Sequence, residues 1–306
     1  MALGIENIAS YIPEKRISNY DRKALFDIDD DFIENRIGVK FVAVKDDTEE
    51  TSDLCFKAFE NLKLKTALDI EQIDALVVVS QNPDSNIPHV SGVLHGRLDL
   101  PETCASFDIS LGCSGYVYGL SIIQSFMKEN GLKRGLLFTA DPYSKVVSPD
   151  DKNTSLLFGD AASVTLVSDT PLYRTGKFSF GTIGKQSQEL RCENGKLFMN
   201  GRAIFNFAAK GVPKDIIKII AENGLEIADI DKFVFHQGSK YIIDTIGARL
   251  KVSPDKIAYD IYDYGNTISS SIPIILEKEM EVPTNNKMVI SGFGVGLSWA
   301  STVLMK

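Results

Sequence analysis

The chain has 306 residues, of which 44% are hydrophobic and 24% are charged, and its formal net charge is −8. Such totals indicate a globular protein with one large domain or two closely packed ones, and the acidic balance argues against general nucleic-acid binding. No apolar run approaches the roughly 20 residues of a membrane span. The first residues lack the basic and apolar segments of a signal peptide, so we expect a cytoplasmic protein without a membrane partner.

Four cysteines are present, and none is spaced from another as metal ligands usually are; they are Cys55, Cys104, Cys113 and Cys192. In a reducing cytoplasm we expect these side chains to be free thiols rather than disulfides. The sequence therefore predicts neither a structural zinc site nor another metal centre.

Short β-rich runs alternate with helical stretches along the chain. The first helix is expected over residues 50–67, where Thr51 or Ser52 could cap it, and another over residues 211–224, which ends at a glycine. Strands are expected around residues 76–79, 136–138, 232–235 and 288–291. Because these runs are apolar on both faces, they predict sheets that helices cover on each side.

Four landmarks recur in the same order in the two halves of the chain. "IEQIDALVVVS" from Ile70 matches "IADIDKFVFHQ" from Ile227, and "GCSGYVYGLSIIQ" from Gly112 matches "GNTISSSIPIILE" from Gly265. Two later pairs follow, "RGLLFTAD" with "NKMVISGFG" and "GDAASVTLVSD" with the terminal "GVGLSWASTVLMK". The pattern predicts two duplicated halves, residues 1–170 and 171–306, that share an interface.

Cys113 lies at a glycine-rich corner, in "SFDISLGCSGYVYGL", where a strand is expected to lead into a helix. Unpaired N–H groups and the positive end of the helix dipole favour a thiolate at such a position. A small buried core residue is the alternative interpretation, and the local sequence does not decide between the two.

Any Cys/His pair must use one of three histidines. His236 ends a predicted strand that the repeat places in register with the strand before Cys113, whereas His89 and His95 are expected in surface or packing positions. Asn266 opens the turn that the repeat pairs with the Cys113 corner, so approximate two-fold symmetry would bring the two turns together. Capping of the next helix is the simpler role for Asn266.

From end to end the chain resembles the thiolase-fold condensing enzymes, and most closely the β-ketoacyl-acyl carrier protein synthase III branch. The resemblance rests on "FIENRIGV", "ETSDLCFKA", "FDISLGCSGYVYGL", "LLFGDAASVTLV", "MNGRAIFNFA", "FHQGS", "YGNTISSSIPI" and "GFGVGLSWAS". Biosynthetic thiolases carry a second cysteine in their final glycine-rich loop, and the corresponding "GFGVG" of this chain has none. Elongating ketoacyl synthases use two histidines in the second half of the chain, where this sequence has only His236. Gln81 stands where hydroxymethylglutaryl-CoA synthases use a glutamate.

This resemblance implies an α/β, thiolase-like duplicated fold with two mixed five-stranded sheets in a layered αβαβα arrangement, and a homodimer. It implies catalytic Cys113, His236 and Asn266, with the backbone N–H groups of Cys113 and Val295 as an oxyanion hole. It also implies acyl-CoA and malonyl-acyl carrier protein thioesters as substrates, and no metal or redox cofactor. The implied residues that bind coenzyme A or the acyl carrier are Phe32, Arg36, Lys152, Gly201, Arg202, Phe205, Gly238, Lys240 and Arg249, and those of the acyl pocket are Ile87 and Phe293.

Some of these positions differ from the family pattern. Phe32 occupies the position of a tryptophan, and Lys152 occupies that of an arginine. Phenylalanine has no indole N–H group, and lysine lacks the planar fork of donors of arginine. Three functions therefore stay open at this point. They are decarboxylative condensation in fatty-acid, specialised lipid or polyketide synthesis, transfer of a cysteine-bound acyl group to an alcohol or amine, and a noncatalytic partner subunit.

Overall fold

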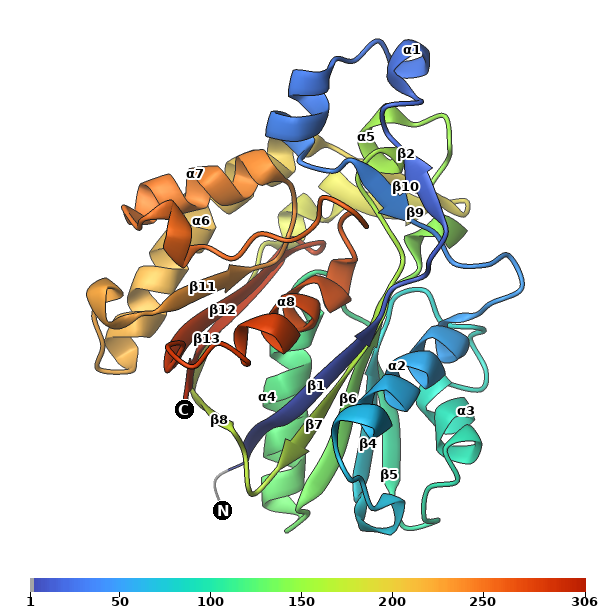
Figure 1. The fold of residues 1–306 in the computed structure, drawn as a ribbon, viewed down its shortest axis with the longest axis vertical. Helices are drawn as coiled ribbons and strands as arrows, with labels where there is room; N and C mark the ends of the chain where they lie inside the picture. Colours follow the sequence, from blue (N-terminus) through green and yellow to red (C-terminus); the bar gives the residue numbers. More distant parts are fainter. Residues whose placement is uncertain (1–2) are drawn as a thin grey trace.

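The computed structural model describes residues 3–306, in which nine strands form one mixed sheet (Figure 1). The sheet order is β11-β12-β13-β8-β1-β7-β6-β4-β5. The strands are β1 (Gly4–Tyr11), β4 (Ala75–Val79), β5 (Ala105–Ile109), β6 (Arg134–Ala140), β7 (Ala162–Ser168), β8 (Tyr173–Thr182), β11 (Lys232–Phe235), β12 (Lys287–Gly294) and β13 (Ser298–Met305). Two small ribbons pair β2 (Arg16–Ser18) with β3 (Phe41–Ala43), and β9 (Leu190–Glu193) with β10 (Lys196–Met199).

The helices lie between and outside these strands. They are α1 (Lys23–Phe26), α2 (Thr51–Lys65), α3 (Val90–Arg97), α4 (Gly115–Glu129), α5 (Lys152–Ser155), α6 (Gly201–Glu222), α7 (Lys240–Leu250) and α8 (Ser271–Glu279). Shorter helical turns are η1 (Phe32–Ile37), η2 (Ile70–Gln72), η3 (Tyr143–Lys145), η4 (Gly184–Glu189), η5 (Ile227–Asp229), η6 (Pro254–Lys256) and η7 (Ile268–Ser270). No helix in residues 3–306 has both the length and the apolar character needed to cross a membrane.

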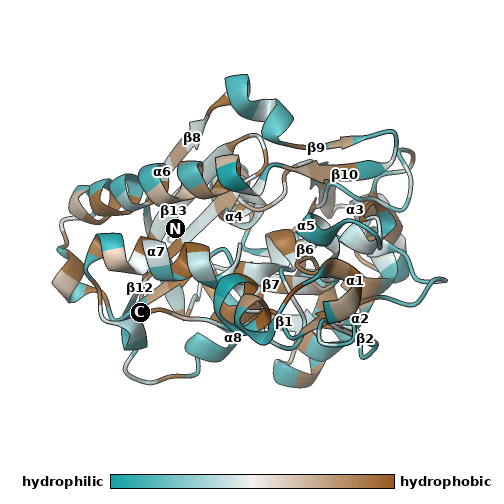
Figure 2. Ribbon diagram, turned by 90° about the horizontal axis from the view of Figure 1, so that it is seen from above, coloured by the Kyte–Doolittle hydropathy of each residue, from teal (hydrophilic) through white to brown (hydrophobic). Residues whose placement is uncertain are grey.

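The helices and strands form the expected αβαβα layers. In Figure 1, α4 and α8 lie between two groups of strands, with α2 and α3 outside one group and α6 and α7 outside the other. Every residue of β4 and β7 is buried, because helices cover both faces. Figure 2 shows hydrophilic and hydrophobic residues alternating along α6, as expected for a helix with one face on the sheet.

The strand count of the second group differs from the prediction of two five-stranded sheets. Five strands (β1, β7, β6, β4 and β5) form the first group, but the second has four, and its fifth position is one parallel bridge between Phe233 and Ile257. Beyond that bridge the chain pairs elsewhere, because the carbonyl of Tyr262 accepts hydrogen bonds from the N–H groups of Lys40 and Phe41. The groups also join into one sheet, through two residue pairs between β1 and β8.

The two groups nevertheless follow matching orders, β1-β7-β6-β4-β5 and β8-β13-β12-β11 with the added bridge. Each group also contributes one helix, α4 or α8, to the central layer. On this basis we propose residues 1–170 and 171–306 as the two related halves of the chain.

Candidate active site

Cys113 lies in the short loop that joins β5 to α4, and its side chain is 3% exposed. Glycines surround it because neighbouring segments approach closely. A β-carbon at Gly112 would lie 2.7 Å from Cγ1 of Val295, and one at Gly294 would lie 2.7 Å from Sγ of Cys113. The final glycine-rich loop therefore packs directly on the nucleophile candidate, as only residues without a side chain permit.

The predicted preference of Cys113 for thiolate is not found. Burial raises the pKa of its thiol to about 12, and the nearby N–H groups of Val295 and of Cys113 itself offset only part of this increase. The N-terminus of α4 does not compensate for the desolvation. The thiol is therefore protonated at neutral pH.

His236 follows β11, and its backbone N–H donates to the carbonyl of Ser291 at 2.8 Å. Its ring Nδ1 lies 2.8 Å from Oγ of Ser271, and the edge of Phe293 packs against the ring with centroids 5.6 Å apart. Burial lowers the pKa of the imidazole to about 3. His236 is thus neutral, and it does not form an ion pair with Cys113.

Asn266 is fixed at both its backbone and its side chain. Its N–H donates to the carbonyl of Leu157 at 2.8 Å, and its carbonyl accepts from the N–H of Gly159 at 2.9 Å. Oδ1 accepts from the N–H of Ile268 at 2.9 Å, so the amide NH₂ group points the other way, toward Nε2 of His236 at 3.5 Å. Asn266 therefore presents a donor group beside the histidine ring, while its Oδ1 also satisfies the first N–H group of η7, as a helix-capping residue does.

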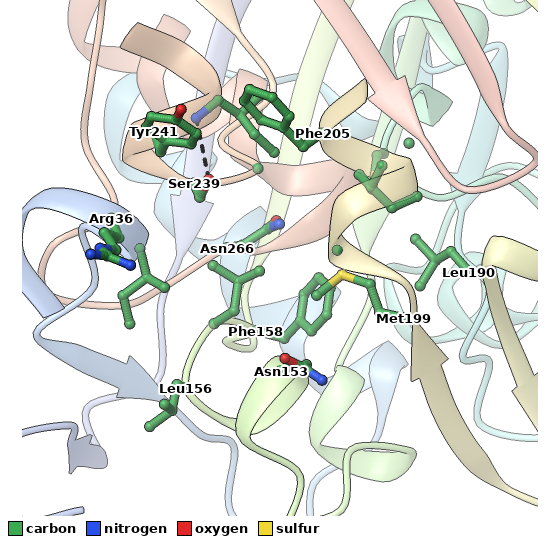
Figure 3. A pocket seen from close by; sticks show the side chains of 18 of the residues that line it. Arg36, Asn153, Leu156, Phe158, Leu190, Met199, Phe205, Ser239, Tyr241 and Asn266 are labelled. Atoms are coloured by element: carbon green, nitrogen blue, oxygen red, sulfur yellow. Dashed lines mark hydrogen bonds between the residues drawn. The ribbon is translucent and has the colours of Figure 1, made fainter. Parts of the chain in front are cut away.

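Cys113, His236 and Asn266 line one pocket of about 660 Å³. In Figure 3, Asn266 lies near the centre of this pocket, with Arg36, Tyr241 and Phe205 toward one end and Phe158, Met199 and Leu190 toward the other. The predicted residues that also line the pocket are Phe32, Arg36, Lys152, Gly201, Arg202, Phe205, Gly238 and Phe293. Segments far apart in the sequence thus bring these groups together.

Four predicted residues do not line the pocket. The amide of Val295 reaches Cys113, but its side chain is absent from the pocket wall. Lys240 forms an ion pair with Asp244 at 2.6 Å, and Arg249 is exposed near the end of α7. Ile87 is 88% exposed in the loop between β4 and α3, so it contributes nothing to the pocket within this chain.

At one end of the pocket, cationic and aromatic side chains are paired. The ammonium of Lys152 lies 5.4 Å from the ring centroid of Phe32 and donates to the carbonyl of Phe26 at 2.8 Å. The rings of Phe205 and Tyr241 stack with centroids 5.0 Å apart. The Lys152 charge therefore has partners within the protein.

Sequence reasoning missed much of the pocket wall and the partner of His236. The additional lining residues are Ile37, Asn153, Leu156, Leu157, Phe158, Leu190, Met199, Ile204, Ser239, Tyr241, Ile242 and Gly294. The motif "LLFGDAASVTLV" contained three of them, and the Asn-Gly pair between Leu190 and Met199 is a strong hairpin signal that could have located two more. Nothing in the local sequence distinguishes Ser271 from Ser269 and Ser270 beside it.

All four cysteines are free thiols, as predicted. Within residues 3–306, no group of three or more His, Cys, Asp or Glu side chains is arranged to hold a metal ion. What the pocket offers instead is a buried thiol, two side-chain nitrogens that lie side by side, and a long apolar wall.

Comparison with known proteins gives one consistent result. Residues 107–184 match the family model of 3-oxoacyl-[acyl-carrier-protein] synthase III, and residues 220–306 match that of its C-terminal part. The β-ketoacyl-[acyl-carrier-protein] synthase III of Lactococcus lactis subsp. cremoris is 31% identical over 320 residues, which cover 98% of each chain.

Solved structures agree with this result. A β-ketoacyl-[acyl carrier protein] synthase III from Thermus thermophilus superposes with a TM-score of 0.92 at 30% identity, covering 99% of each chain. A priming β-ketosynthase of a polyketide biosynthetic pathway gives a TM-score of 0.91 at 25% identity, covering 99% of this chain and 96% of its own. The thiolase-like fold expected from the sequence is therefore confirmed, and the chain belongs to the β-ketoacyl-acyl carrier protein synthase III family of acyl-transferring condensing enzymes.

Proposed function

We propose that the protein joins an acyl group to a malonyl thioester by decarboxylative condensation, with Cys113 as the carrier of the acyl group. In the first half-reaction Sγ of Cys113 attacks the carbonyl carbon of an acyl thioester. The thiol proton passes to the departing thiol, and the acyl group stays on Cys113 as a new thioester. The apolar wall around Phe158, Leu190 and Met199 supports an acyl chain as the bound group.

In the second half-reaction a malonyl thioester loses carbon dioxide and leaves an enolate. The enolate carbon attacks the acyl-cysteine carbonyl, a 3-ketoacyl thioester forms, and the released Cys113 thiolate takes up a proton. Nδ2 of Asn266 and Nε2 of His236, 3.5 Å apart, can both donate to the enolate oxygen. This convergence beside a buried thiol is the observation that carries the proposal, because donors aimed at a developing negative charge lower the barrier most.

We assign the N–H groups of Cys113 and Val295 as the oxyanion hole of both tetrahedral intermediates. Both N–H groups lower the pKa of the Cys113 thiol, and their proximity to the sulfur that attacks the thioester carbonyl supports this assignment. Both N–H groups belong to the backbone, so they need no reorganisation during the reaction.

Coenzyme A or acyl carrier protein would present the thioesters at the end of the pocket that Arg36, Lys152 and Arg202 border. Phe32, Phe205, Gly201 and Gly238 would contact the carrier arm there, while Lys240 and Arg249 on α7 would meet an acidic carrier protein. The matching positions in the family pattern support these roles. Fatty-acid and polyketide synthesis both fit the similar proteins.

We also propose a homodimer and a cytoplasmic location. The edge position of β5, whose residues are all only partly buried, and the exposed Ile87 support a partner subunit on this side of the molecule. Four free thiols suit a reducing compartment.

Intact-protein mass spectrometry after incubation with a panel of acyl-CoA and acyl-carrier donors tests the first half-reaction. We expect a mass gain of one acyl group that is lost in Cys113→Ala. Release of labelled carbon dioxide from a malonyl thioester tests the second, and we expect His236→Ala and Asn266→Ala to lower it by about 100-fold while acylation continues.

Other outcomes would select the alternatives. Acyl uptake followed by transfer to an added alcohol or amine, without carbon dioxide release, would indicate an acyltransferase. No uptake from any donor would indicate a noncatalytic partner subunit. Neither the acyltransferase nor the noncatalytic subunit is favoured, because the chain retains Cys113, His236 and Asn266 and its relatives are condensing enzymes.

A further inference from the structure

The ring of His236 has a buried hydroxyl partner on its inner side. Oγ of Ser271, the first residue of α8, lies 2.8 Å from Nδ1 of His236 and 2.9 Å from the carbonyl oxygen of Ile268. Ser271 is 1% exposed, so these contacts are shielded from bulk solvent. The single hydroxyl proton of Ser271 can therefore be donated to either of two acceptors, the ring nitrogen Nδ1 or the backbone carbonyl of Ile268.

This shared proton decides which ring nitrogen of the neutral histidine carries its own hydrogen. If Ser271 donates to Ile268, Nδ1 must be protonated to bond Oγ, and Nε2 is left as an acceptor. If Ser271 donates to Nδ1, the hydrogen of the ring lies on Nε2, on the side of Asn266. Only the second tautomer can donate to an oxyanion in the pocket.

The contact with Asn266 is compatible with the second arrangement. Oδ1 of Asn266 is held by the N–H of Ile268, so its NH₂ group faces Nε2. The separation of 3.5 Å is at the long limit of a hydrogen bond, so this contact does not require Nε2 to act as an acceptor. In the second arrangement Nδ2 of Asn266 and Nε2 of His236 can therefore both donate to one substrate oxygen.

We propose that Ser271 is a positioning residue that donates its hydroxyl proton to Nδ1 of His236 and thereby keeps the ring hydrogen on Nε2. Its catalytic consequence rests on the proposed function, because a donor at Nε2 is useful only if an oxyanion forms in this pocket. The Ile268 backbone already lies near enough to the imidazole to raise its pKa. Without the Ser271 hydroxyl we therefore expect the ring hydrogen to move to Nδ1, where the Ile268 carbonyl can accept it.

The tautomer can be read directly from ¹⁵N chemical shifts of labelled histidine. The chain has three histidines, so His89→Gln with His95→Gln leaves His236 as the only labelled residue. We expect the Nε2–H form in this background and the Nδ1–H form after Ser271→Ala. Ser271→Thr, which retains a hydroxyl, should keep the Nε2–H form.

Ser270→Ala is the matched control. Ser270 is as buried as Ser271 and immediately precedes it, but its hydroxyl bonds to Thr139 and not to His236. Its loss removes one buried hydroxyl and should leave the His236 tautomer unchanged. An unchanged tautomer in a folded Ser271→Ala protein would overturn the proposal, as would the same tautomer change in both alanine variants.

Kinetics test the consequence separately. We expect Ser271→Ala to lower malonyl decarboxylation by about 10- to 100-fold with Cys113 acylation preserved, and Ser270→Ala to lower neither selectively. If the wild-type protein decarboxylates no malonyl thioester, the proposed function fails while the tautomer measurement still decides the role of Ser271. A tautomer change without a change in decarboxylation would contradict the catalytic consequence alone.

Discussion

Gly294 lies directly against Cys113, so closely that a β-carbon at position 294 would be 2.7 Å from both Cβ and Sγ of the cysteine. The contact joins the end of β12 to the loop before α4, residues that are 181 positions apart in the chain. It leaves the sulfur room to react only because residue 294 has no side chain.

Gly294→Ala should therefore slow the acylation of Cys113 while the protein still folds. Forcing a methyl group into a packed site costs about 1–3 kcal/mol, which corresponds to at least a severalfold loss of acyl-enzyme formation if the strain falls on Sγ. The rate at which the protein gains the mass of one acyl group, after addition of an acyl donor, measures the acylation of Cys113. Gly184→Ala is the control, because a β-carbon there would meet no atom within 4 Å. Equal acylation rates in the two variants would contradict this account of the contact.

The reactivity of Cys113 in the empty site should rise steadily with pH. Its pKa is raised to about 12 by burial, so the thiolate fraction grows tenfold for each pH unit below that value. Alkylation of Cys113 by iodoacetamide, followed by peptide mapping in a Cys192→Ser background that removes the exposed thiol, should increase log-linearly between about pH 7 and 9. A plateau near neutral pH would show instead that the empty site stabilises the thiolate.

Asp141 should make folding stability depend on pH. Its carboxylate accepts from the N–H of Gln81 at 2.7 Å and from the hydroxyl of Ser269, but burial raises its pKa to about 7. Because this folded-state pKa lies above the unfolded value of about 3.9, the contribution of Asp141 is complete below that value and is lost as pH rises toward 7.

Asp141→Asn removes this titration. The unfolding free energy of the wild type, measured with urea relative to the variant, should fall by at least ~1 kcal/mol between about pH 5 and pH 7. Asparagine keeps only one acceptor oxygen, so the variant is expected to be less stable at the acidic end. Parallel profiles for the two proteins would show that Asp141 does not hold a proton in the folded state.

Ile87 should matter for assembly rather than for folding. It is 88% exposed, in the loop between β4 and α3 on the side of the molecule where β5 forms the sheet edge. If a partner subunit covers this side, Ile87→Asp should weaken the dimer, because the new carboxylate would be buried in the interface. Light scattering after size-exclusion chromatography would detect the dissociation. Leu64→Asp is a matched control, because Leu64 is 86% exposed on α2. Equal behaviour of the two variants would argue against an interface at Ile87.

The sequence alone determined the layered fold and the three residues now found together in the pocket. Strand patterns, glycine turns and a repeat of four landmarks are local features, and they placed Cys113, His236 and Asn266 at the ends of equivalent elements. Residue type and periodicity indicate such elements, because backbone geometry and side-chain chemistry are fixed over a few positions. The αβαβα arrangement and the catalytic role of the three residues came from the resemblance to the condensing enzymes.

Only the tertiary structure decided how these groups behave. The helix terminus predicted a thiolate at Cys113, but burial, to which the distant Gly294 loop contributes, has the larger effect on its pKa. Likewise, three consecutive serines look alike in the sequence, and only the packing of α8 against β11 brings Ser271 to Nδ1 of His236. Desolvation and hydrogen bonding depend on segments that are distant along the chain, so no local pattern contains them.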